Sequence, residues 1–207
     1  MRPIILRIFS ALIFGAVLIF GAVVLFGSDR LLEIALGPVE RTPVIFAKLV
    51  LPDRPNHYLV CPDKFCAATP DRKSVEFDIP VSELQNRWRK MIDRRPRVRL
   101  IAKSTDGLQA DYVQKSAVIG FPDTITVRFI PRGDKRSTLA IFSRSHYGHS
   151  DLGVNRERVD ARLAAINNPK YYENCLENLF HMVIECNSRI NVQGLDTVTA
   201  ELEYRKT

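Results

Sequence analysis

The chain has 207 residues, of which 46% are hydrophobic, and its formal net charge is +7. A chain of this length accommodates one domain with a substantial core, so a second domain is not required. The positive excess is local, because seven arginine and lysine residues fall between positions 87 and 99. Such a run is typical of a solvated face around an amphipathic helix, and contact with anionic lipid headgroups is the alternative.

Residues 8–27 form an apolar run with no charge and one polar side chain, Ser10. As a helix they would cover about 30 Å, the thickness of the hydrocarbon core of a bilayer. Arg2 and Arg7 precede the run, which predicts a cytoplasmic N-terminus over residues 1–7 and a transmembrane helix over residues 8–27. A cleaved signal peptide is the alternative, although its apolar core is usually only about 7–15 residues. We therefore expect a single-pass protein of the bacterial inner membrane, anchored in the lipid bilayer, whose domain lies in the periplasm and meets no nucleic acid.

Residues 28–56 predict an interfacial connector. The run from 31 to 51 is apolar, but charged residues and prolines interrupt it, which excludes a second membrane span. Pro52 and Pro55 then keep the chain extended. The extracytoplasmic α+β domain is expected over residues 57–207.

The first helix of this domain is predicted over residues 81–94. Leu84, Trp88 and Met91 recur there at helical spacing, while most of the arginines occupy the positions between them. Pro96 ends the helix.

Four strands are expected next, because apolar and polar residues alternate and turn residues separate the alternating runs. These strands cover residues 98–103, 108–118, 124–129 and 139–145. They predict an antiparallel four-stranded meander. The expected fold class is therefore α+β, with an N-terminal single transmembrane helix, one domain containing the meander and flanking helices, and a C-terminal strand.

The segment from 143 to 159, SRSHYGHSDLGVNRERV, leads from the last of these strands into a second helix over 152–166, with Ser150 or Asp151 as the N-cap. This segment resembles the signature of the bacterial and plastid proteins grouped as domain-of-unknown-function family 1499. An upstream part also resembles that family, at Cys61, Pro62, Asp63 and Cys66. The resemblance covers about residues 61–166 and implies an α+β fold in a membrane or envelope setting, with no established activity. The matching positions of the signature are Ser143, Ser145, Gly148, 150–156, Arg158 and Val159.

Polar residues of this segment form a candidate anion-binding patch at the end of a strand and the start of a helix. Backbone N–H groups and arginines converge at such a place, and both favour anions. The alternative is that the same residues cap the helix and tie it to the sheet. The candidates are Ser143, Ser145, Ser150, Asp151, Asn155, Arg156 and Arg158.

An enzyme is the rival class. His146, His149 and Asp151 offer imidazole and carboxylate groups that could bind zinc, but their spacing is only a weak indication. A serine hydrolase has still less support, since no nucleophile elbow accompanies the serines. We expect no cofactor, and we favour a binding module over an enzyme.

The four cysteines are Cys61, Cys66, Cys175 and Cys186, and an even count in an oxidising compartment favours disulfides. A third helix beginning at residue 168 is expected to include Cys175 and Cys186, about 16 Å apart and too distant to pair. An extended Cys61–Cys66 segment would have the same length. We therefore predict two bridges between that segment and the helix. A local Cys61–Cys66 bond, with Cys175 and Cys186 buried and free, is the alternative, and a cysteine metal cluster is the third possibility. Residues 197–204 predict the final strand.

The sequence thus predicts an envelope protein that acts as a binding or interaction module through a polar anion-binding patch. Anionic lipid headgroups or an envelope protein are the expected partners. A zinc-dependent or serine hydrolase at the membrane surface is the alternative.

Overall fold

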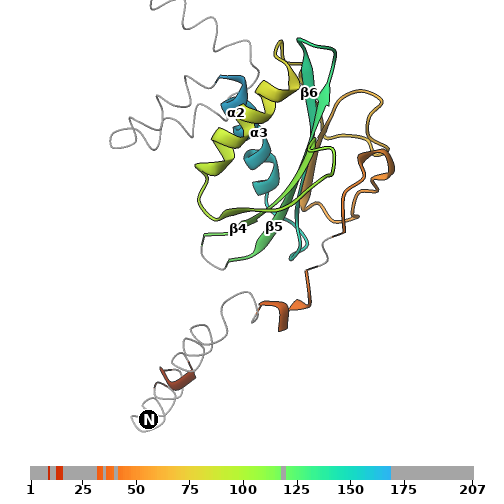
Figure 1. Cartoon of the computed structure of the whole chain (residues 1–207). Coiled ribbons are helices and arrows are strands. Elements are labelled where there is room, and N and C mark those ends of the chain that lie inside the picture. Colours follow the sequence, from red (N-terminus) through yellow and green to blue (C-terminus); the bar gives the residue numbers. More distant parts are fainter. Residues whose placement is uncertain are drawn as a thin grey trace, which may run out of the picture.

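The computed structural model describes residues 9, 13–15, 32–34, 36–39, 42–117 and 120–168, and its centre is one mixed sheet (Figure 1). The strand order is β2-β1-β6-β5-β4-β3. The strands are β1 (His57–Cys61), β2 (Arg72–Lys73), β3 (Val98–Lys103), β4 (Gln109–Lys115), β5 (Pro122–Pro131) and β6 (Ser137–Ser145). The helices whose bounds the structure describes are the 3-10 turn η1 (Phe46–Lys48), α2 (Val81–Asp93) and α3 (Val154–Asn167).

The predicted four-stranded meander is wrong in extent, because the sheet has six strands. β3 to β6 do pair antiparallel in chain order. β1 then adds to β6 antiparallel, and β2 adds to β1 parallel. The first seven residues of β6 are buried, which is the pattern of a strand with a neighbour on each side and cover on both faces. The short β1 lies just after a proline-rich stretch, and four of its five residues are buried, so its sequence lacks the alternation of apolar and polar residues that predicted the other strands.

The membrane-spanning part of the predicted fold class is also corrected. Residues 8–27 lie almost wholly outside the described part of the chain. Within the described residues, no helix has both the length and the apolar character needed to cross a bilayer. The described fold is therefore a six-stranded mixed sheet with helices packed on it.

The helices α2 and α3 cover one face of the sheet (Figure 1). Leu84 and Trp88 of α2 are almost completely buried there. The indole of Trp88 lies 6.3 Å from the ring of Tyr112 and 6.1 Å from that of Phe129, measured between centroids. Because α2 carries its apolar residues on one stripe, this packing buries the stripe and leaves the basic residues outside.

The opposite face is covered in part by residues 42–51, here called the strap. Val44, Phe46 and Leu49 of the strap are buried against β1 and β6. The backbone carbonyl of Val44 accepts a hydrogen bond of 3.0 Å from Gln109 of β4. Part of the segment predicted as a connector is therefore integral to the folded domain.

Two further predictions lie outside the described residues. These are the third helix with Cys175 and Cys186, and the final strand over 197–204.

Candidate functional site

The candidate anion-binding residues meet where β6 ends and α3 begins. Ser143, fully buried on β6, donates a hydrogen bond of 2.6 Å to the side-chain oxygen of Asn155 on α3. The Asn155 amide in turn donates to Ser145 Oγ and to the backbone oxygen of Asn56, each at 3.0 Å. The Asn56 amide donates to the carbonyl of Gly148 at 3.0 Å. These bonds fasten α3 and the chain before β1 to the end of β6.

Arg158 completes this network from the next turn of α3. One of its terminal nitrogens donates to Ser143 Oγ at 3.1 Å and to Asn155 Oδ1 at 2.5 Å. Its other terminal nitrogen forms an ion pair with Asp123 of β5, and each of the two side chains is only 10% exposed. Asp123 therefore balances the charge of Arg158, and the donors of Arg158 that these bonds occupy are not available to a ligand.

The N-cap of α3 is Gly153, so the predicted N-cap, Ser150 or Asp151, lies two or three residues too early, but the Asp151 side chain still binds backbone groups at the start of the helix. Its two carboxylate oxygens accept hydrogen bonds from the backbone of Gly153 at 3.1 Å and of Asn155 at 2.7 Å. Ser150 Oγ accepts one from the backbone of Leu152 at 3.2 Å. Leu152 has a φ of 53° and Gly153 a φ of 84°, so the chain makes a left-handed turn before the helix.

Arg156, by contrast, is exposed at the surface of α3. Its guanidinium lies 5.4 Å from the centroid of the Tyr58 ring, a cation–π contact with β1. Burial raises the pKa of the Tyr58 hydroxyl, and the negative charge of Asp160 raises it further. The Tyr58 hydroxyl therefore stays protonated near neutral pH, and its ring is an uncharged partner for Arg156.

The three residues considered for zinc do not form a metal centre. His146 shares a short hydrogen bond with Thr124 of β5, and His149 is exposed. The carboxylate of Asp151 accepts hydrogen bonds from the backbone at the start of α3. Within the ranges that the structure describes, no three His, Cys, Asp or Glu side chains are grouped so that they could hold a metal ion.

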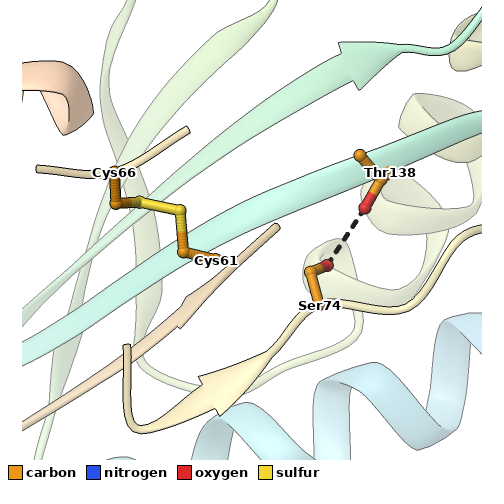
Figure 2. Close-up of a disulfide and its surroundings, with 4 residues drawn as sticks. All are labelled: Cys61, Cys66, Ser74 and Thr138. Atoms are coloured by element: carbon orange, nitrogen blue, oxygen red, sulfur yellow. Dashed lines mark hydrogen bonds between the residues drawn. A yellow bond between two sulfur atoms is a disulfide. The ribbon is translucent and has the colours of Figure 1, made fainter. Parts of the chain in front are cut away.

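The disulfide joins Cys61 to Cys66, with the two Cα atoms 6.3 Å apart (Figure 2). The predicted bridges from these cysteines to Cys175 and Cys186 are wrong, and the local Cys61–Cys66 bond of the alternative is confirmed. The segment is not extended, because Phe65 donates a backbone hydrogen bond of 3.3 Å to the Pro62 carbonyl and closes a turn. Cys175 and Cys186 lie outside the described residues.

The disulfide loop is fastened to the rest of the domain on two sides. The backbone of Ala67 donates to the carbonyl of Phe46 in the strap at 2.9 Å, and Ser74, beyond the loop, donates to the carbonyl of Cys61 at 3.0 Å. Ser74 also accepts a hydrogen bond of 3.2 Å from Thr138 of β6 (Figure 2). A cavity of about 330 Å³ lies beside the disulfide and leaves Cys66 partly accessible.

A second group of charged residues lies at the end of α2 and the start of β3. Arg89, Lys90, Arg97 and Arg99 are all exposed, and we call them the basic surface. None of the four forms an ion pair with another residue in the described part of the chain. Arg97 Nε donates only to the carbonyl of Lys115, at 3.3 Å, so its charge is not neutralised by this bond.

Sequence reasoning missed Asn56 as a member of the network. It stands in a proline-rich stretch 99 residues before Asn155, and no local pattern marks it. The basic surface, in contrast, is visible in the sequence as a run of arginines. Only its accessibility, and the lack of acidic partners for it among the residues that the structure describes, required the structure.

Comparison with known proteins places the chain in a family. Residues 50–166, more than half of the chain, match the family model described as "Protein of unknown function (DUF1499)". No curated protein and no solved structure matches the chain. The matched region includes all six strands, α2, all but the last residue of α3, the disulfide and the hydrogen-bond network between β6 and α3. The chain therefore belongs to the DUF1499 family of proteins of unknown function.

Proposed function

We propose that this protein is a binding module that docks on anionic lipid headgroups through the basic surface of Arg89, Lys90, Arg97 and Arg99. The observation that carries the proposal is that these four side chains are exposed and lack acidic partners among the described residues. Each cation near a negatively charged bilayer contributes about 1 kcal/mol of attraction. Four such cations would together give a substantial affinity, which salt would weaken.

The position of the basic surface is compatible with a planar partner. Its four residues come from the second half of α2 and from the start of the edge strand β3, where the domain is accessible. The described cavity, beside the disulfide, is not lined by any of them. Cations spread along the surface match a layer of headgroups better than they match one small anion, which needs converging donors.

The network at the start of α3 is a weaker candidate for this role. Anion binding there stays a prediction, because Arg158 is paired with Asp123 and the side chains of Ser143 and Asn155 bond to each other. This arrangement favours the alternative in which the motif ties the helix to the sheet.

The disulfide supports a location in an oxidising compartment. Disulfides persist outside the reducing cytoplasm, and the bacterial periplasm is one such compartment. A domain placed there would face the anionic headgroups of a membrane leaflet.

Vesicle binding tests the proposal. The full-length chain is mixed with vesicles of phosphatidylcholine alone or with three parts in ten of phosphatidylglycerol, and the bound fraction is measured by sedimentation. We expect binding that requires the anionic lipid and weakens with added salt. The Arg89→Glu/Lys90→Glu variant should bind at least about tenfold more weakly, at about 1 kcal/mol for each cation lost.

The matched control is Lys48→Glu/Lys135→Glu, which changes the net charge by the same amount at two exposed positions elsewhere. This control should retain most of the binding. Equal losses in the two variants would show that only net charge matters, and binding that ignores both lipid charge and salt would overturn the proposal. Selective binding to an acidic protein instead of vesicles would favour an envelope protein as the partner.

A further inference from the structure

Strand pairing places the start of β3, which carries Arg97 and Arg99 of the basic surface, and the loop before α3 at the same end of the sheet. Val98 at the start of β3 pairs with Gln114, and Gln114 pairs with Asp123 near the start of β5. Asp123 pairs with Ser145, the last residue of β6. The turn with Arg97 and the loop over residues 146–153 therefore leave the sheet on one side, separated by three strand spacings, or about 14 Å.

This loop presents apolar side chains to solvent. Leu152 is 91% exposed and Val154, the first residue of α3, is 47% exposed. The exposed Arg156 and His149 lie close to them in the chain. Tyr147 of the same loop donates a hydrogen bond of 2.8 Å to the carbonyl of Gly37, next to Leu36, which is 51% exposed.

Neither the backbone conformation nor core packing explains why a leucine stands at position 152. The backbone there is left-handed, with a φ of 53°, a conformation that glycine or asparagine adopts more readily than leucine. The side chain has little contact with the core, since almost all of it is exposed. Hydrogen bonds from Leu152 to Ser150 and from Gly153 to Asp151 nevertheless hold this turn in place.

We infer that Leu152 and Val154 insert into the interface of an anionic bilayer while the basic surface contacts its headgroups. This inference rests on the proposed function, and it assigns the side of the domain that faces the lipid. Apolar side chains beside cations are the combination that binds such an interface, because the apolar groups leave water and the cations meet phosphates. The end of the sheet that holds Val98 and Ser145 is then the membrane-facing end.

Leu152→Asn is the first test, because asparagine tolerates the left-handed backbone and removes the apolar side chain. With full-length protein and the anionic vesicles described above, we expect roughly tenfold weaker binding and an unchanged or higher melting temperature. The salt dependence should remain that of the unmodified protein, because the cations are intact. Unchanged binding by a folded Leu152→Asn variant would overturn the inference.

Val154→Trp supplies a second and independent readout. The only native tryptophan, Trp88, is 1% exposed and gives a constant background. On anionic vesicles containing brominated lipid, we expect the new tryptophan to be quenched and its emission to move to shorter wavelength. Lys135→Trp, in the turn between β5 and β6 at the other end of the sheet, should show neither change.

The outcomes separate this inference from the proposed function. If the protein binds vesicles in a salt-dependent way but Val154→Trp stays unquenched, the membrane-facing end is wrong and the basic surface stands. If neither variant nor the unmodified protein shows salt-dependent binding, the proposed function fails and the inference fails with it.

Discussion

At the scale of single residues, the same side chains can belong to a site or to the framework, and their partners decide which. Ser143, Asn155 and Arg158 have the residue types of an anion pocket. In the folded chain they bond to one another, and Asp123 balances the one charge among them. A buried polar network in which each group finds a partner fixes the position of a helix on a sheet.

Arg158→Ala should destabilise the domain by about 3 kcal/mol, because it leaves the Asp123 carboxylate buried without its partner. Urea unfolding measures this loss. Arg156→Ala is the matched control two residues earlier on α3, and loss of its contact with Tyr58 should cost less than about 1 kcal/mol. Similar losses in the two variants would contradict a structural role for the Arg158 network.

Asp106 gives a prediction for pH. Hydrogen bonds from Arg128, then from Ser104 and from the backbone of Leu108, lower the pKa of its carboxyl group below the ordinary 3.8. The stabilisation from these contacts is therefore complete above that ordinary value and is lost as the pH falls through the lowered one.

The melting temperature of Asp106→Asn, measured from pH 6 down to pH 2, should accordingly approach that of the unmodified protein as the solution becomes more acidic. A difference that stays constant over this range would contradict the role assigned to the carboxylate.

At the scale of elements, periodicity was sufficient wherever the residues of an element recur at a regular spacing in the sequence. The α2 helix and the strands β3 to β6 were predicted because apolar residues recur in them at the spacing of a helix or of a strand, even though β6 is buried on both faces. β1 and β2 were missed because they show no such spacing. Four of the five residues of β1 are buried on both faces, so they do not alternate, and β2 has only two residues. The disulfide was misassigned because an extended segment was assumed where a turn brings Cys61 and Cys66 together.

Replacing both Cys61 and Cys66 by alanine should lower the free energy of unfolding by about 2 kcal/mol, because so short a loop restricts the unfolded chain only modestly. Chemical denaturation under oxidising conditions measures the change. The control is Cys175→Ser/Cys186→Ser, which leaves this bond intact. Mass analysis of alkylated protein should show Cys61 and Cys66 blocked before reduction, and alkylation of either one would contradict the assigned pair.

At the scale of the whole molecule, the two faces of the sheet are covered by different means. The helix α2 comes after β1 and β2 in the chain, the helix α3 comes after β6, and together they cover one face. The strap precedes β1 and packs on the other face (Figure 1). Cover on both faces leaves the ends of the sheet and the edge strand β3 accessible. The basic surface and Leu152 lie in these accessible places, so the vesicle experiments test how the whole domain is oriented.

The sequence by itself determined the family, the α2 and α3 helices, the central strands and the local excess of positive charge. These properties depend on residue types and on their spacing over short distances, which a linear pattern preserves. Only the tertiary structure decided that the strap packs on the sheet, that Cys66 is the partner of Cys61, and that Asp123 neutralises Arg158. Each of these depends on the path of the chain in three dimensions, because contact between residues far apart in sequence is set by strand pairing and turns, on which composition and periodicity carry little information.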